Sequence, residues 1–258
     1  MKQKIYICNF SGGKDSTAML FKLLENNKPI DYIIFCDTGV EFPEVYKHIN
    51  KVNTILQNEY GKQITFIKPK LNFIEYMTVY KRKRGNNKGL PYFFPSHKNR
   101  WCSGMLKLYP MYKFKKQLVK QVASKQLVFV EYIGYSLNET KRAKKAINQA
   151  LNRNKRNKQY KEYLKFPLIY YKMNTKDILE YCYSLGFNWD GLYEHIDRAS
   201  CFTCPFANNK ELKYLITQRP ELWAVIKKLE LNLKKLGIST WKYKPNKSTE
   251  EIEAELLS

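Results

Sequence analysis

Long apolar runs are missing from this chain of 258 residues. None approaches the roughly 18 residues that a membrane-spanning helix needs. The first ten residues are typical of a β-strand and lack the apolar region and cleavage site of a secretory signal, so we expect a cytoplasmic protein with no membrane anchor. Six cysteines are too few for a disulfide-held scaffold. The hydrophobic fraction of 44% still provides a core, which excludes a fully disordered chain.

Acidic side chains are also scarce, because 23 of them stand against 46 lysines and arginines, and the net charge is +23. The excess is concentrated in residues 81–100, with seven basic side chains and no acid, and in residues 141–165, with ten basic side chains and one acid. We interpret this clustering as a surface for a polyanion such as tRNA or DNA. The alternatives are a general compositional bias and binding of the phosphates of a small nucleotide.

Apolar segments alternate with helical patterns along the first two thirds of the chain. Strand composition is found at residues 4–10, 31–35, 63–67 and 127–133, and helical spacing at residues 16–24, 43–59 and 108–124. This alternation predicts an α/β fold with a doubly wound, mostly parallel, Rossmann-like sheet. We expect two parts, residues 1–170 and a helical C-terminal region at residues 171–258. We also expect a mobile basic segment at residues 150–162 and a frayed acidic tail at residues 249–258.

The motif SGGKDS, residues 11–16, stands between the first strand and the first helix. In such a turn the glycines let backbone N–H groups approach an oxyanion, and the helix N-terminus favours negative charge. The serine hydroxyls and Lys14 add donors and a counter-charge. The motif therefore predicts a phosphate-binding turn, and the alternative is an ordinary Ser/Gly turn that caps a helix.

Three further segments extend this motif into a family resemblance. They are Cys36-Asp37-Thr38-Gly39 with Glu41-Phe42-Pro43-Glu44, Trp101-Cys102-Ser103 with Leu106-Lys107, and Gly134-Tyr135 with Glu139 and Arg142. Together with the SGGKDS motif they resemble the PP-loop proteins of the adenine nucleotide α-hydrolase superfamily, in particular the phosphoadenosine phosphosulfate reductase-like family. The resemblance covers about residues 4–235 and implies a nucleotide lying across the carboxyl ends of the strands.

The resemblance also implies roles for single residues. It implies nucleotide binding by Ser11, Gly12, Gly13, Lys14, Asp15, Ser16, Asp37, Thr38, Gly134 and Arg142, and catalytic roles for Lys14, Asp15 and Lys107. Two departures are visible. An arginine of the family pattern is missing near Ser136, and no cysteine follows Cys204, where sulfonucleotide reductases have their catalytic one. Ordinary sulfonucleotide reduction is therefore disfavoured.

Cys201 and Cys204 have the C-x-x-C spacing that lets two thiols face one metal, and Cys102 lies in one of the family-like segments. We expect these three cysteines to bind one metal centre. Three thiolates suit a [4Fe–4S] cluster with one open iron, or a Zn²⁺ ion completed by a histidine such as His195. The alternative is a metal-free pair.

Aromatic residues interleave with the basic segment at residues 81–100. They are Tyr76, Tyr80, Tyr92, Phe93 and Phe94. Aromatic faces beside cations suit the stacking of bases in single-stranded nucleic acid. The alternative is a loop that packs its own aromatic side chains on the domain.

These features together predict an enzyme that binds ATP with Mg²⁺ and adenylates an oxygen of its substrate with release of pyrophosphate. We expect it to support transfer of sulfur to tRNA or DNA, with a sulfur donor protein such as a cysteine desulfurase as a partner. The alternative hypotheses are a sulfonucleotide reductase that uses external thiols, and a nucleotide-gated nucleic-acid-binding module without catalysis.

Overall fold

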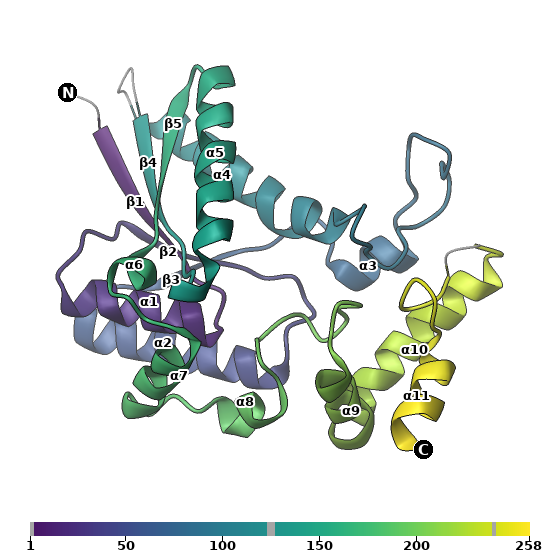
Figure 1. Cartoon of the computed structure of the whole chain (residues 1–258). Helices are drawn as coiled ribbons and strands as arrows, with labels where there is room; N and C mark the ends of the chain where they lie inside the picture. Colours follow the sequence, from purple (N-terminus) through teal and green to yellow (C-terminus); the bar gives the residue numbers. More distant parts are fainter. Residues whose placement is uncertain (1–2, 123–126, 239–240) are drawn as a thin grey trace. The chain divides into compact units, whose positions relative to one another are not determined.

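The computed structural model describes residues 3–122, 127–238 and 241–258 of the chain (Figure 1). The strands are β1 (Gln3–Asn9), β2 (Tyr32–Cys36), β3 (Ile64–Ile67), β4 (Leu127–Tyr132) and β5 (Tyr160–Lys165). The helices are α1 (Lys14–Glu25), α2 (Pro43–Tyr60), α3 (Phe73–Thr78), α4 (Tyr109–Gln121), α5 (Thr140–Arg156), α6 (Pro167–Tyr170), α7 (Thr175–Ser184), α8 (Leu192–His195), α9 (Asn209–Gln218), α10 (Pro220–Lys235) and α11 (Thr249–Leu257). A π-helical segment (Ser103–Leu108) leads into α4.

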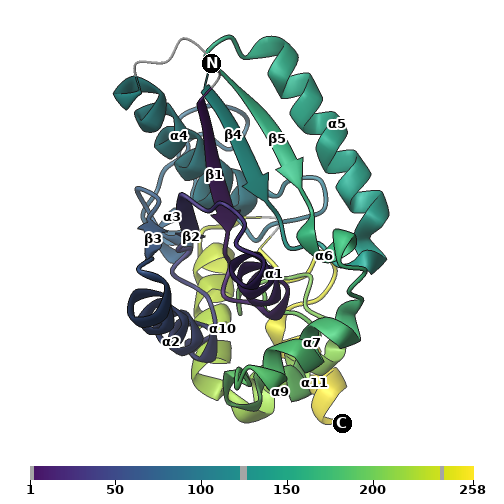
Figure 2. The same ribbon diagram turned by 90° about the vertical axis from the view of Figure 1, so that its left-hand side faces the viewer.

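The five strands form one sheet in the order β3-β2-β1-β4-β5, and every pairing is parallel. Figure 2 shows the arrowheads of β1, β4 and β5 pointing the same way. The chain leaves β1 toward β2 on one side and leaves β4 toward β5 on the other, so the order of the sheet reverses between β1 and β4. The carboxyl ends of strands at such a reversal are where open α/β sheets bind ligands. The predicted doubly wound α/β fold with a helical C-terminal region is confirmed.

The contacts divide the chain into two compact units. Unit 1 comprises residues 1–36, 43–67 and 111–190 and contains all five described strands. Unit 2 comprises residues 37–42, 68–110 and 191–258. The expected division of the sequence at residues 170 and 171 stays a prediction.

One core cluster of unit 1 lies between the sheet and α4. The buried members of this cluster are Ile5, Ile7, Ile34, Leu118, Leu127, Phe129 and Tyr160. A buried ion-pair group lies beside them, because Lys115 of α4 donates hydrogen bonds to Glu131 of β4 and to Glu162 of β5. Two charged partners satisfy the buried ammonium group here, as a charge at such a site requires.

The expectation of a mobile basic segment at residues 150–162 is wrong. α5 continues to Arg156 and β5 begins at Tyr160, and Figures 1 and 2 both show α5 running beside β5. Arg153 Nε donates to Glu162 Oε2 at 2.8 Å, and Lys115 Nζ donates to Glu162 Oε1 at 2.8 Å. The single acid of the basic segment thus ties it to the sheet.

Unit 2 encloses a second, smaller core between its helices. Glu230 of α10 accepts hydrogen bonds from Tyr243 N at 2.6 Å and from Thr249 N at 2.9 Å, so it fixes the start of α11. Ser248 and Glu251 form a capping box at that start, and Ile252 is buried. The tail that was expected to fray is therefore a capped and docked helix.

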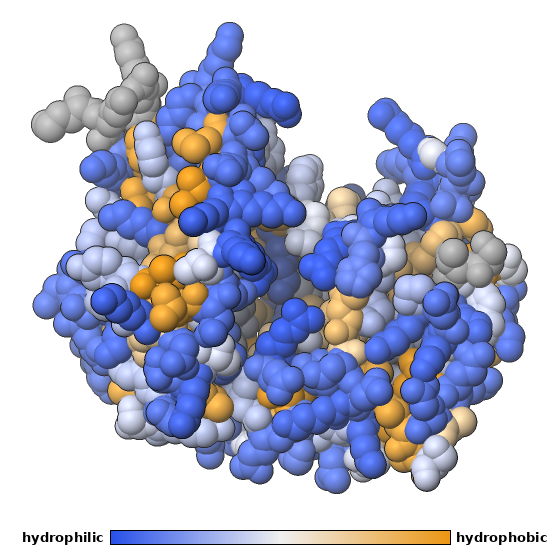
Figure 3. Space-filling view, viewed as in Figure 1, coloured by the Kyte–Doolittle hydropathy of each residue, from blue (hydrophilic) through white to orange (hydrophobic). Residues whose placement is uncertain are grey.

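The exposed side chains are mainly hydrophilic. Figure 3 shows hydrophilic side chains over most of the face in view, with a few apolar ones among them. Exposed apolar residues include Ile147 and Leu151 of α5. None of the helices in the described ranges is both long and apolar enough to cross a membrane.

Candidate functional site

The turn between β1 and α1, residues 11–16, is held together by its serines. Ser11 N donates to Ser16 Oγ at 3.1 Å, and Ser16 Oγ donates to Gly13 O at 2.9 Å. Gly13 is the N-cap of α1 and supplies no side-chain hydrogen bond to the helix. Because the first N–H groups of a helix have no partner within the helix, those of α1 suit an anionic acceptor.

Gly12 allows this turn to lie close to α2. Its φ of +76° is in the left-handed region, and a Cβ atom there would lie 2.7 Å from Ile49 Cγ1. Trp189 Nε1 donates to Gly12 O at 2.8 Å. A side chain at Gly12 would therefore strain the backbone and displace the helix beneath the turn.

Gly134, which follows β4, packs directly on the same turn. A Cβ atom at Gly134 would lie 2.8 Å from Asp15 O and 3.1 Å from Ser16 N. The carboxyl ends of β1 and β4 are neighbours in the sheet, so both segments meet where its order reverses. The structure thus brings Gly134 and residues 11–16 together.

Charged groups surround this meeting point. Lys14 is buried, and its Nζ lies 3.2 Å from Asp15 Oδ2. Burial raises the pKa of Asp15, the nearby Lys14 ammonium opposes that shift, and the charge of Glu139 adds to it. Arg142 Nη1 donates to Glu139 Oε1 at 2.6 Å. Two predicted nucleotide-binding groups, Lys14 and Arg142, are therefore already engaged by carboxylates of the chain.

Unit 2 contains a second cluster, centred on Glu41. The Glu41 side chain is buried and accepts a hydrogen bond from Thr38 Oγ1 at 2.9 Å and one from Cys201 Sγ at 3.5 Å. Lys107 Nζ lies 3.7 Å from the same oxygen, Glu41 Oε1. Thr38, Lys107 and Cys201, which were singled out separately in the sequence, are thus joined through one carboxylate.

Asp37 shapes the segment that leads into this cluster. Its Oδ1 accepts a hydrogen bond from Gly39 N at 2.9 Å, and Gly39 has a φ of +78°. Phe73 N donates to Thr38 O at 3.1 Å. Asp37, Thr38 and Lys107 all belong to unit 2, whereas residues 11–16 belong to unit 1. Their expected roles at one nucleotide stay a prediction.

The three predicted metal ligands all lie in unit 2. Cys204 N donates to Cys201 O at 3.0 Å, which closes the C-x-x-C turn. Burial raises the pKa of the Cys102, Cys201 and Cys204 thiols, and at Cys201 the Glu41 carboxylate adds to the shift while Lys107 opposes it. A charged Cys204 would also raise the pKa of Cys102 and of Cys201.

These thiols are not arranged as a metal centre. Among the residues that the structure describes, no group of three or more His, Cys, Asp or Glu side chains is placed to hold a metal ion. His195, the histidine considered for zinc, stacks on Tyr214 with ring centroids 4.5 Å apart. The [4Fe–4S] cluster and the Zn²⁺ alternative both need deprotonated thiols, and burial raises the pKa of all three thiols, which opposes the loss of their protons. The metal centre stays a prediction.

Glu41 is the member of the unit 2 cluster that sequence interpretation missed. It was quoted only as part of a family-like segment. A usable signal was its place between Val40 and Phe42, both of which are buried. An acid within a short apolar run is expected either to point outward or to find partners in the interior.

Comparisons with known proteins show the family of the chain. Residues 5–207 match the sequence model described as the phosphoadenosine phosphosulfate reductase domain. The chain is also 30% identical over 220 residues to MJ0066, an uncharacterized protein of Methanocaldococcus jannaschii. That match covers 83% of this chain and 39% of MJ0066, so the chain spans about two fifths of the length of this relative. The matched residues include the 11–16 turn, Gly134 and all three candidate cysteines.

Proposed function

Because the chain belongs to the phosphoadenosine phosphosulfate reductase family, we propose that it is an enzyme that binds ATP through residues 11–16 and adenylates an oxygen of its substrate. One observation carries the proposal. The turn offers the uncapped N-terminus of α1 where the order of the sheet reverses, with Gly134 packed against it. Backbone N–H groups at such a position bind phosphate oxygens, and a helix dipole favours their charge.

The proposed reaction is a transfer of the adenylyl group. An oxygen of the substrate attacks the α-phosphorus of ATP, and the bond from that phosphorus to the bridging oxygen of pyrophosphate breaks. The products are the adenylated substrate and pyrophosphate. The N–H groups of the turn and the Ser11 hydroxyl, which is exposed, would stabilise the charge that develops on the departing pyrophosphate.

Lys14 and Asp15 act together in this proposal. The Lys14 ammonium lies 3.2 Å from the Asp15 carboxylate. Its positive charge favours the charged form of Asp15 and so opposes the rise in the Asp15 pKa that burial causes. The Asp15 side chain is 31% exposed, so it would hold Mg²⁺, which commonly uses one or two carboxylates and keeps several waters. When bound, Mg²⁺ supplies positive charge to the phosphates.

Nucleic acid is the proposed substrate class. The exposed cations of α5 are Lys141, Arg142, Lys144, Lys145, Arg153, Lys155 and Arg156. Among these, Arg142 and Arg153 are paired with acids of the chain. The others form a basic helix surface in unit 1 that supports binding of a phosphate backbone.

Sulfur transfer remains the finer prediction beyond adenylation. It needs a sulfur nucleophile, and burial raises the pKa of the three candidate thiols, which disfavours their thiolate forms. Thiolation therefore calls for sulfur from a donor protein or for a rearranged cysteine cluster. Metal analysis and a UV-visible spectrum of protein purified without oxygen will test the cluster independently of ATP binding.

The test of adenylation combines binding and product release. We expect Ser11→Ala and Gly13→Val each to weaken ATP binding in calorimetry, because the first removes a hydroxyl donor and the second blocks approach to the backbone. Ser184→Ala, at an exposed serine of α7, is the matched control. Release of pyrophosphate from ATP should depend on the nucleic-acid substrate.

Two outcomes would contradict the proposal. If Gly13→Val binds ATP as tightly as the wild type, the nucleotide site lies elsewhere. If the protein releases sulfite from an adenylyl sulfate in the presence of a thiol, and no pyrophosphate from ATP, the reductase alternative is correct.

A further inference from the structure

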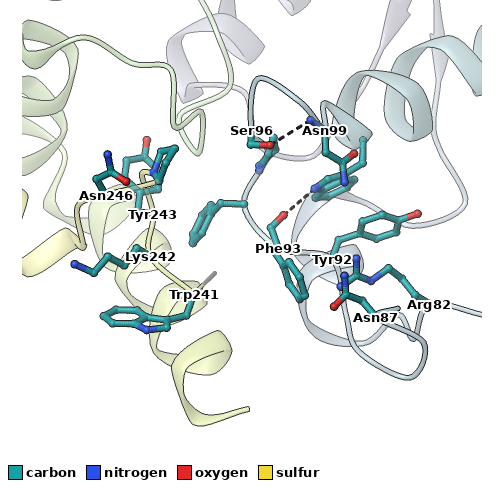
Figure 4. A pocket seen from close by; sticks show the side chains of 14 residues that line it. Arg82, Asn87, Tyr92, Phe93, Ser96, Asn99, Trp241, Lys242, Tyr243 and Asn246 are labelled. Carbon is teal, nitrogen blue, oxygen red and sulfur yellow. Dashed lines mark hydrogen bonds between the residues drawn. The ribbon is translucent and has the colours of Figure 1, made fainter. Parts of the chain in front are cut away.

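Unit 2 has a cavity of about 740 Å³ that none of the proposed roles uses. Figure 4 shows Arg82, Asn87, Tyr92 and Phe93 on one side of it and Trp241, Lys242, Tyr243 and Asn246 on the other. Of the described residues that line it, none is acidic. Its volume lies within the range of small-molecule sites.

Two aromatic rings of this cavity differ from the others. Tyr92 stacks on Trp101 with centroids 4.6 Å apart and on Tyr80 at 5.6 Å, so this part of the loop packs on its own aromatic side chains. By contrast, no ring of the described residues stacks on Trp241 or on Phe93. These two rings lie on opposite sides of the cavity. A cation lies over each of them, Arg82 over Phe93 and Lys234 over Trp241, where its Nζ is 4.9 Å from the ring centroid.

Arg82 supplies the positive charge. Its guanidinium lies 4.1 Å from the centroid of the Phe93 ring, and its Nε donates to Leu90 O at 3.4 Å. Its Nη2 is buried and has no hydrogen-bond partner among the described residues. Lys242, the other cation of the cavity, is paired with Glu251 at 2.9 Å. A buried donor without a partner is costly, so Arg82, which lines the cavity, gains a hydrogen bond if its guanidinium turns toward an anionic oxygen there.

We propose that this cavity binds an unpaired nucleotide of a single-stranded nucleic acid, with its base between Phe93 and Trp241 and its phosphate at Arg82. The side-chain amides of Asn87 and Asn246 provide donors and acceptors for the edge of the base. The proposal rests on nucleic acid as the substrate of the enzyme, and it names the part of that substrate which unit 2 recognises.

A strand suits the cavity better than a free nucleotide. The cations of residues 81–100 extend beyond the cavity, and Lys81, Lys83, Arg84, Lys98 and Arg100 are all exposed. Proteins that bind single strands combine such a basic track for the backbone with aromatic platforms for the bases. The phosphates on either side of the bound nucleotide would follow this track.

The experiment measures binding of a fluorescein-labelled octamer of uridylate to the full chain by anisotropy. Trp241→Leu and Phe93→Leu should each weaken binding about tenfold, because each removes an aromatic ring on which a base stacks. Trp241→Phe keeps a ring and should restore most of the affinity. Arg82→Gln should lower the log–log salt slope by about 0.7, the value for one phosphate of a single strand.

Matched controls separate the cavity from general effects. Tyr170→Leu removes an exposed aromatic ring of unit 1, and Lys28→Gln removes an exposed cation there. Both variants should bind the octamer as tightly as the wild type. Melting curves check that each variant is folded. Photocrosslinking of a 5-iodouridine octamer to the wild type, followed by peptide mapping, should modify Phe93 or Trp241 and needs no variant.

Several results would overturn the proposal. Equal binding by Trp241→Leu and the wild type, together with crosslinks only outside the cavity, would refute it. If inorganic polyphosphate competes as strongly as unlabelled octamer, binding depends on charge alone and the bases are not recognised. Equal affinity for uridine monophosphate would make the ligand a free nucleotide. Calorimetry with ATP is run on the same variants. Loss of octamer binding with ATP binding intact supports the cavity, whereas failure of ATP binding in the wild type contradicts only the proposed adenylation.

Discussion

Gly134→Ala tests whether the close approach of the segment after β4 shapes the phosphate-binding turn. The added Cβ would lie 2.8 Å from Asp15 O, 3.0 Å from Asp15 C and 3.1 Å from Ser16 N. These atoms belong to the backbone of the first turn of α1, so no flexible side chain can move aside. The φ of Gly134 is outside the left-handed region, so the substitution adds steric contact without left-handed backbone strain.

The expected cost follows from this geometry. Inserting a methyl group into a well-packed site costs about 1–3 kcal/mol when the backbone must shift. A value of about 2 kcal/mol corresponds to a fall in Tm of about 4–8 °C for a chain of this size. The shift also separates Gly134 from Asp15 and Ser16, so the affinity for ATP should fall more steeply than stability alone would suggest.

Differential scanning calorimetry and isothermal titration with ATP measure the two effects. Gly104→Ala is the matched control, because a Cβ there meets nothing within 4 Å and Gly104 lies in a helical segment. That substitution should leave Tm unchanged or raise it slightly, since alanine has the higher helix propensity. An unchanged Tm and unchanged ATP affinity in Gly134→Ala would refute the reasoning.

Three further predictions concern buried charges. Glu41→Gln removes a carboxylate that raises the pKa of Cys201, while Lys107, which lowers it, remains. In a protein whose other cysteines are replaced by serine, alkylation of Cys201 by iodoacetamide at about pH 8 should therefore accelerate, and an unchanged rate contradicts this. Lys115→Met removes the only ion-pair partner of Glu131 among the described residues and leaves Glu162 paired with Arg153 alone, and it should cost about 3–5 kcal/mol in urea unfolding at neutral pH. This deficit should shrink toward about pH 5, because protonation then stabilises the folded variant more than its unfolded chain. Burial lowers the pKa of His48 to about 3, so the folded protein favours the neutral ring. The contribution of His48 to the free energy of unfolding is therefore fully present above the ordinary histidine pKa and is lost as the pH falls below that value. His48→Gln should therefore lose less unfolding free energy than the wild type between about pH 7 and about pH 5.

Four of the five strands were predictable because their signal is local. β1 to β4 are apolar runs whose composition alone indicates burial on both faces. β5 has the sequence YKEYLK, half of it charged, and only Tyr160 and Glu162 are buried. Glu162 belongs in a strand because Lys115 approaches it from α4. That partner is remote in sequence, so no window around β5 reveals it.

The candidate site divides in the same way. The 11–16 turn was recognisable because its serines and glycines lie within six consecutive residues. The contact between Gly134 and Asp15 and the hydrogen bond from Cys201 to Glu41 depend on the fold that brings distant segments together. Likewise, Trp241 belongs to no recognisable sequence motif, and only the structure shows that it lines the same cavity as Arg82.

The alternation of the two units along the chain constrains how the protein is made. Residues 68–110 of unit 2 leave the ribosome before β4 and β5, yet α10, on which α3 packs, is translated only afterwards. The nascent chain must therefore hold Phe73, Trp101 and their aromatic neighbours without their final cover while the sheet is completed. A fragment ending at residue 207, where the family match stops, would lack α9 to α11 and leave those side chains exposed. Such a fragment should attract chaperones and aggregate, so loss of the last 51 residues is expected to remove soluble protein before it removes any single activity.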